Sequence, residues 1–231
     1  GIAPLDRLRL GCFVADGVFG SSPLIETPQF AALRRWEDPV VALGKVMAHE
    51  RLAAAARALA TGMLALSARD RALDSIFKDA GRYVAAMCAF NLHAEDELTL
   101  PRLKAICAET GFLSPGRARS LLQFLEHLGY VAPLARGRGG AATVYAATSA
   151  FLTAWEAQLR VALDAARMIE PAVGRVLERL HEPQTLRIFT RLHTEGLVAS
   201  AAAGDGGVLP FVSAFLHHHA GMQVVWVLIE G

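Results

Sequence analysis

Residues 114–129 read SPGRARSLLQFLEHLG and carry the clearest helix pattern in the chain. Ser114 is a preferred N-cap residue, and Pro115 suits the first helical position because an N–H there would be unpaired anyway. Apolar residues then recur every three or four positions and form one stripe, made of Ala118, Leu121, Leu122, Leu125 and Leu128. Gly129 is typical of a helix stop. We therefore predict an amphipathic helix between Ser114 and Gly129.

Shorter elements are expected on both sides of this helix. Thr99 begins a pattern with helical spacing that ends at Gly111. After Gly129, the β-compatible stretches 130–135 and 143–147 flank Arg136-Gly-Arg-Gly-Gly140. This arrangement predicts a β-hairpin with a basic, glycine-rich tip.

The order helix, short turn, helix, glycine and hairpin, over residues 82–155, resembles the winged helix-turn-helix of the MarR-type bacterial transcription regulators. In that family the second helix usually begins with a Ser or Thr cap. It ends in Gly followed by two apolar residues, as Gly129, Tyr130 and Val131 do here. The resemblance implies a DNA-binding transcriptional regulator that acts as a homodimer on double-stranded DNA, and the three widely spaced cysteines fit the reducing cytoplasm. A small-molecule effector bound among the flanking helices would change the separation of the two recognition helices.

The outward face of the second helix supplies the candidate DNA-binding residues. Arg can pair bidentately with guanine and Gln with adenine in the major groove. A glycine near the helix N-terminus lets the backbone approach a phosphate, and arginines at a hairpin tip can enter the minor groove. The candidates are Ser114, Gly116, Arg117, Arg119, Ser120 and Gln123 on the helix, with Arg136 and Arg138 on the hairpin. The alternative explanation is a solvated polar helix face and a charged, soluble hairpin tip.

Charge is concentrated in the same segment. The whole chain has a net charge of +1, which by itself does not indicate a nucleic-acid partner. Residues 100–140 contain six basic side chains against two acidic ones, whereas residues 151–231 contain six against eight. The central segment is therefore the expected basic surface.

The rest of the chain is predicted to be mainly α-helical. Ala and Arg are abundant, and both favour helices. The predicted helices cover 39–66, 69–92, 152–180 with a break at Pro171, and 186–198. We expect three regions: an N-terminal arm and helices (1–75), the winged helix-turn-helix (76–150) and a C-terminal helical dimerisation region (151–231).

The dimerisation prediction rests on apolar content. Hydrophobic residues make up 53% of the chain and charged residues 19%, with a mean hydropathy of +0.34. The helix predicted over 152–180 carries an apolar seam. The helix predicted over 39–66 could cover part of this seam within the same chain, but the apolar stretch 209–229 competes for the same burial. We therefore expect a two-fold dimer that buries the seam, including Leu159 and Leu163.

Several other classes of function lack support in the sequence. The three cysteines, Cys12, Cys88 and Cys107, form no CxxC pair, so we expect neither a disulfide framework nor a zinc site. The adjacent histidines 217–219 point about 100° apart on a helix and cannot share one ion, which favours a surface cluster. His93 is expected to cap a helix end rather than bind a metal.

No catalytic constellation, nucleotide-binding loop or cofactor motif is found, so we expect no enzyme activity. No apolar run is long enough to span a membrane. The main alternative function is a winged-helix module that binds proteins rather than DNA. An enzyme with an apolar pocket between helices is a more distant alternative.

Overall fold

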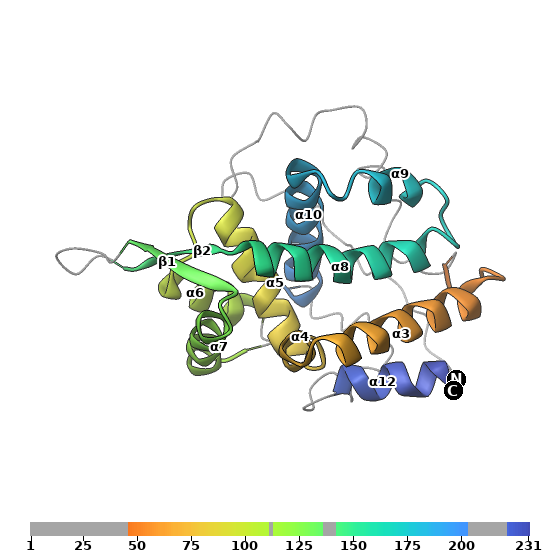
Figure 1. Cartoon of the computed structure of the whole chain (residues 1–231), viewed down its shortest axis with the longest axis horizontal. Coiled ribbons are helices and arrows are strands. Elements are labelled where there is room, and N and C mark those ends of the chain that lie inside the picture. The colour runs from red at the N-terminus through yellow and green to blue at the C-terminus, as the bar shows by residue number, and fades with distance from the viewer. Residues whose placement is uncertain (1–45, 111–112, 136–141, 203–220) are drawn as a thin grey trace, which may run out of the picture. The chain divides into compact units, whose positions relative to one another are not determined.

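The computed structural model describes residues 46–110, 113–135, 142–202 and 221–231. The chain divides into two compact units, 1–42 and 43–231, and every described residue lies in the second. The described part is mainly helical, with one two-stranded antiparallel sheet (Figure 1). Its elements are α3 (Leu52–Arg69), α4 (Arg71–Phe77), α5 (Ala80–Ala94), α6 (Leu100–Thr110), α7 (Pro115–His127), β1 (Val131–Ala135), β2 (Val144–Ala147), α8 (Ser149–Ala166), α9 (Val173–Glu178), α10 (Pro183–Ala202) and α12 (Gly221–Glu230).

Helix α7 has the ends that its sequence predicts. The Ser114 hydroxyl accepts a hydrogen bond from the Arg117 N–H at 3.4 Å, and Pro115 is the first helical residue. Gly129 follows the helix with a φ of +71°, a left-handed conformation that glycine adopts without steric cost. The predicted amphipathic helix is therefore confirmed, with Ala118, Leu121, Leu122 and Leu125 buried.

The predicted hairpin is also present. Strands β1 and β2 pair antiparallel, with Val131 opposite Ala147. The residues just before α6 join the hairpin, because the Tyr145 N–H donates to the Leu98 carbonyl at 2.8 Å and Thr99 forms an isolated bridge with Val144. Its basic tip, including Arg136 and Arg138, lies outside the described residues.

The N-terminal helices differ from the prediction in two ways. The helix predicted over 39–66 is interrupted within the described residues: 46–47 are helical, 48–51 are not, and α3 then runs from Leu52 to Arg69. The single helix predicted over 69–92 is wrong, because the chain forms α4 and α5 with separate starts. Asp70 accepts hydrogen bonds from the N–H groups of Ala72 and Leu73, and Asp79 accepts one from Arg82. Each carboxylate satisfies N–H groups that a helix start leaves unpaired.

The C-terminal half follows the predicted breaks. Thr148 caps α8, which ends at Ala166, and Pro171 lies between α8 and α9. Helix α10 begins at Pro183 and continues to Ala202, further than the predicted end at Val198. The apolar stretch predicted over 209–229 is described only from Gly221, where α12 begins.

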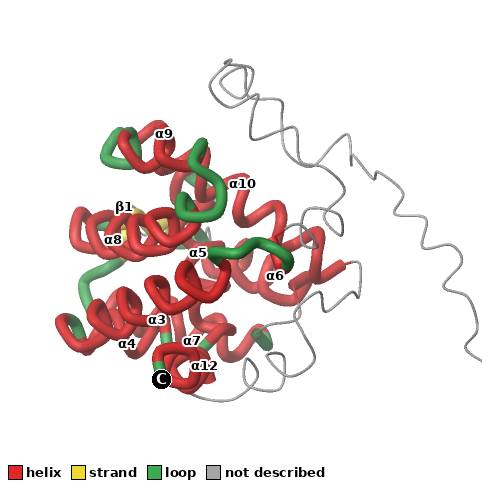
Figure 2. Tube along the Cα trace, turned by 90° about the vertical axis from the view of Figure 1, so that its right-hand side faces the viewer, coloured by secondary structure: helices red, strands yellow, loops and turns green. Residues whose placement is uncertain are grey.

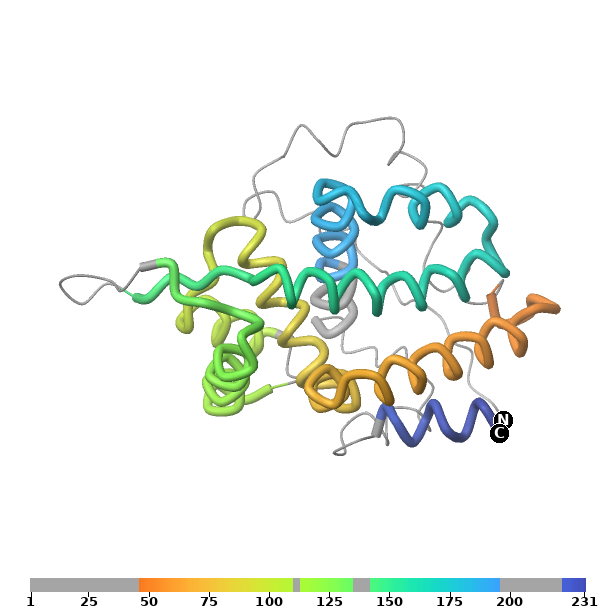
Figure 3. The backbone as a smooth tube through the Cα atoms, in the orientation of Figure 1, coloured from red at the N-terminus to blue at the C-terminus, as the bar shows by residue number. Residues whose placement is uncertain are grey.

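The helices pack around α8. Strand β2 leads directly into α8, and the chain can be followed through this connection in Figure 3. Helix α8 packs against α3 and α9, and α12 packs along α3, so these four helices lie one above another in Figure 2. Helix α3 approaches α8 closely, because a Cβ placed on Gly62 would lie 2.5 Å from Cγ1 of Val161. Packing of α3 against α8 therefore favours glycine at position 62.

The apolar seam of α8 is buried within the single chain. Trp155 is fully buried against the rings of Phe90 and Phe151, and its indole N–H donates to the Thr190 hydroxyl at 3.0 Å. Leu159 and Leu163 are only 3% and 6% exposed. The prediction that these two leucines lie in a dimer interface is therefore wrong, because helices of the same chain already cover them.

Candidate functional site

The outward face of α7 is exposed as the helical period predicts. The apolar stripe faces α6 and the hairpin, which leaves the polar side chains in solvent. A Cβ added at Gly116 would meet nothing within 4 Å, so the backbone there is open to a ligand. The exposed residues include all six predicted on this helix: Ser114, Gly116, Arg117, Arg119, Ser120 and Gln123.

The exposed face of α7 is electropositive near the helix N-terminus. Arg117 and Arg119 have no ion-pair partner among the described carboxylates. The positive end of the helix dipole lies beside them. The Ser120 hydroxyl is partly engaged, since it donates to the Gly116 carbonyl at 3.3 Å.

A recess beside this face contains a further arginine that the sequence analysis missed. The recess has a volume of about 260 Å³ and is lined by Arg82, Leu113, Arg117, Ser120, Leu121 and Phe124. The Arg82 guanidinium lies over the Phe124 ring at 5.8 Å and donates to the Ser75 carbonyl at 2.8 Å. Arg82 comes from α5, so only the tertiary packing of α5 against α7 brings it next to Arg117.

One arginine of the predicted basic surface, Arg102, is paired with a carboxylate. Arg102 forms an ion pair with Glu97, which lies just before the basic segment 100–140. That pair neutralises Arg102. The structure therefore places Arg82, Arg117 and Arg119 around the start of α7, and it does not place Arg136 and Arg138.

The two described cysteines are buried and His93 is half-buried. Cys88 and Cys107 are buried, and burial raises the pKa of their thiols to about 12 and about 11. His93 lies in the last turn of α5, and burial lowers its pKa. No cluster of three metal-binding side chains occurs among the described residues, whereas Cys12 and histidines 217–219 lie outside them.

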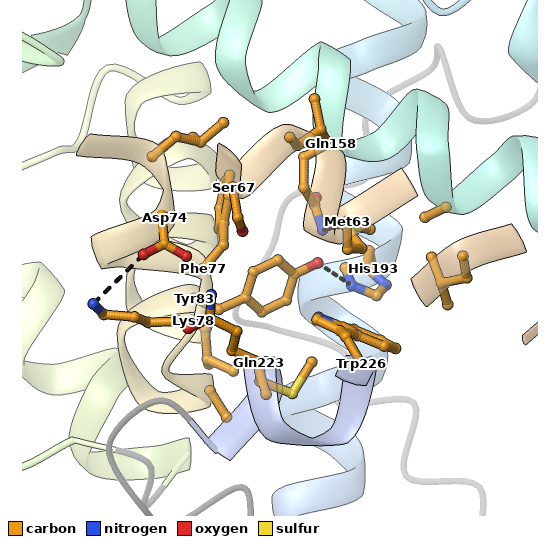
Figure 4. A pocket seen from close by; sticks show the side chains of 17 residues that line it. Met63, Ser67, Asp74, Phe77, Lys78, Tyr83, Gln158, His193, Gln223 and Trp226 are labelled. Carbon is orange, nitrogen blue, oxygen red and sulfur yellow. Dashed lines mark hydrogen bonds and ion pairs between the residues drawn. The ribbon is translucent and has the colours of Figure 1, made fainter. Parts of the chain in front are cut away.

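A second candidate site is a mainly apolar cavity of about 300 Å³. Helices α3, α4, α5, α8, α10 and α12 contribute side chains to it, so its members are far apart in sequence (Figure 4). Tyr83 and His193 share a hydrogen bond of 3.3 Å between the hydroxyl and Nε2. Lys78 and Asp74 form an ion pair of 3.5 Å at another part of the wall.

Burial controls the ionisation of the groups in the cavity. Desolvation raises the pKa of Tyr83 to about 12, partly offset by a hydrogen bond with the Gln158 side chain. Desolvation also lowers the pKa of His193 from its ordinary value of 6.5. Both side chains are therefore neutral at neutral pH, and the Lys78 charge is balanced by Asp74.

Comparisons with models of protein families, with curated protein sequences and with solved structures find no match for this chain. Its function must therefore be inferred from its own residues. In the part of the chain that the structure describes, no helix combines the length and apolar character needed to cross a bilayer.

Proposed function

We propose that residues 76–150 form a winged helix-turn-helix and that the protein is a DNA-binding transcriptional regulator. The observation that carries this proposal is α7 itself. It is a capped helix with an exposed, basic and polar face, and it is followed by a hairpin whose sequence places arginines at the tip. The pairing of residues 98–99 with β2 supports the same arrangement, because it joins the start of α6 to the hairpin.

In this proposal α7 enters the major groove of double-stranded DNA. Arg119 and Gln123 are exposed on α7, and Arg and Gln are side chains that can read base edges in the major groove. Gly116 and Arg117 lie at the helix start, where backbone N–H groups and positive charge suit a phosphate. Arg82 extends this phosphate-binding surface, since it shares a recess with Arg117.

The proposal includes a homodimer in the bacterial cytoplasm. Two copies of α7 about 34 Å apart would reach successive major grooves of a pseudo-palindromic site. Arg136 and Arg138 would then contact the flanking phosphates or the minor groove from each hairpin tip. The seam of α8 does not supply the interface, because Leu159 and Leu163 are buried in the core.

Selection of bound duplexes from a random DNA pool, followed by titration at several salt concentrations, tests the proposal. We expect pseudo-palindromic sites and an affinity that falls steeply with salt. Arg119→Ala should cost about 1–3 kcal/mol on the selected site and loosen its sequence preference. Arg117→Ala should weaken binding to all sequences alike and reduce the salt slope by about 1.

Arg175→Ala is the matched control, because Arg175 is exposed on α9, which is not part of the proposed interface. This variant should bind the selected site like the unsubstituted chain. Absence of measurable DNA binding at low salt would overturn the proposal and favour a protein-binding module. If Arg175→Ala and Arg119→Ala lose equal affinity for the selected site, α7 is not the helix that recognises the DNA sequence.

A further inference from the structure

The mainly apolar cavity contains a buried hydrogen-bond acceptor without a donor. Gln158 is 6% exposed, and its side-chain oxygen Oε1 has no hydrogen-bond partner within the described residues. The rest of the side-chain amide is engaged: it has a hydrogen bond with Tyr83, and its nitrogen faces Sδ of Met63 at 3.9 Å, a weak contact. A buried carbonyl oxygen left without a donor costs free energy that a bound molecule with an N–H or O–H group would recover.

The wall around Gln158 restricts the chemistry of that molecule. Aromatic rings of Phe77, Tyr83 and Trp226 line the cavity, and most of the other lining residues are Leu, Ala, Val or Met. A flat aromatic ligand suits such a wall. Figure 4 shows Gln158 and Trp226 on opposite sides of the Tyr83–His193 pair, so a ligand among them would meet both apolar surface and the amide.

The charges in the wall indicate an uncharged ligand. Among the described residues that line the cavity, only Lys78 and His193 could carry a positive charge. Lys78 is paired with Asp74. His193 lies in an environment that disfavours its protonated form. A charged ligand would therefore lose hydration without finding an unpaired opposite charge.

We propose that this cavity binds a small, uncharged aromatic ligand of one or two rings that donates an N–H to Gln158 Oε1. Its volume of about 300 Å³ lies at the lower end of the range for ligand pockets. Asp74 Oδ1, a second buried acceptor without a partner among the described residues, offers a further position for a donor. The proposal is independent of DNA binding, because none of the lining residues belongs to α7.

Indole is a suitable probe, because it is an uncharged two-ring molecule with one N–H donor. The chain has five methionines, of which Met63 and Met222 line the cavity. With ¹³C-methyl-labelled methionine, indole should shift the NMR signals of Met63 and Met222. The signals of Met47, which is exposed, and Met87, which is buried elsewhere, should stay in place. An absence of shifts at Met63 and Met222 up to the solubility limit of indole would overturn the proposal.

Benzothiophene is the matched ligand control, since sulfur replaces the N–H in a ring system of nearly the same shape. It should bind about tenfold more weakly than indole, because Gln158 Oε1 then stays without a donor. Gln158→Met keeps the side-chain length and removes the acceptor, so indole and benzothiophene should bind this variant within about twofold of each other. Equal binding of the two ligands to the unsubstituted chain would refute the role of Oε1, as would an unchanged preference for indole in Gln158→Met.

Ala162→Phe tests the location of the site, because Ala162 lines the cavity from α8 and a phenyl group would fill it. This variant should lose at least tenfold in affinity for both ligands. Circular dichroism establishes that it is folded. If it does not fold, the methionine shifts in the unsubstituted chain decide the location. Unchanged affinity in a folded Ala162→Phe variant would contradict the proposal.

Discussion

His193 is a neutral histidine held among apolar side chains, and this has a consequence for stability. Its pKa in the folded chain lies below 6.5 because burial disfavours the charged form. As pH falls below 6.5, the unfolded chain binds a proton at this residue before the folded chain does. Protonation therefore favours the unfolded state, and stability falls as pH decreases through this range.

His193→Gln should reduce this pH dependence, because glutamine does not titrate. Urea unfolding at pH 7.5 and pH 5.5 gives the free energy of unfolding at each pH. We expect a smaller loss between the two pH values in the variant than in the unsubstituted chain. Some loss should remain, since His93 also has a lowered pKa. An equal loss in both proteins would show that His193 does not contribute.

Sequence reasoning located the exposed residues of α7 but missed the cavity residues. The positions of Arg119 and Gln123 follow from the helical period within one element, so a single stretch of sequence suffices to predict their exposure. Tyr83 and His193 are 110 residues apart and meet only when α5 and α10 pack. Nothing in the local pattern around Gln158 on α8 distinguishes it from an exposed glutamine.

Helix boundaries show the same division between local and nonlocal information. Ser114, Gly129 and Thr148 act through groups within a few residues, and all three predicted boundaries are confirmed. The separation of α4 from α5 was missed although it is also local. It was missed because the apolar period continues across the boundary. The residue that marks the boundary is Asp79, whose carboxylate accepts a hydrogen bond from the Arg82 N–H at 3.0 Å. An Asp within a periodic pattern should therefore be weighed as an N-cap.

The contact between α3 and α8 gives a prediction about Gly62. Alanine favours a helix by about 1 kcal/mol over glycine, but its Cβ would lie 2.5 Å from Cγ1 of Val161. Overpacking of this kind typically costs about 1–3 kcal/mol, and valine has little freedom to move aside. Gly62→Ala should therefore lower the free energy of unfolding by about 1 kcal/mol, measured by urea denaturation.

Val161→Ala provides the control for this prediction, because it removes the methyl group that the new Cβ would meet. In that background Gly62→Ala should raise the free energy of unfolding by up to about 1 kcal/mol, the full helix-propensity gain. If Gly62→Ala has the same effect in both backgrounds, the close approach of the two helices is not what requires glycine.

Burial of the α8 seam changes what is expected of the whole molecule. A periodic apolar face shows that a helix must be covered, but the sequence does not show whether the same chain or a second copy covers it. In the structure, α3, α9 and α10 cover α8 from within the chain. The seam is therefore evidence for a tertiary core, and the homodimer of the proposed regulator needs a different surface.

The variant Leu159→Glu tests whether the seam of α8 belongs to the core or to a dimer interface. A dimer-interface residue would yield a folded monomer, whereas a core residue yields an unfolded chain. Because Leu159 is 3% exposed, a carboxylate there loses apolar contacts and its own hydration, at a cost on the order of 4 kcal/mol or more. We expect loss of the helical circular dichroism signal or a much lower unfolding midpoint.

Val227→Glu introduces the same charge at a position that is 56% exposed on α12, so it should leave the unfolding midpoint nearly unchanged. Sedimentation velocity of both variants beside the unsubstituted chain completes the comparison. A compact Leu159→Glu monomer with a native circular dichroism spectrum, derived from a dimeric unsubstituted chain, would restore the seam as an interface. An unfolded Leu159→Glu chain beside a folded Val227→Glu chain assigns the seam to the core, because only the position of the added charge differs between them.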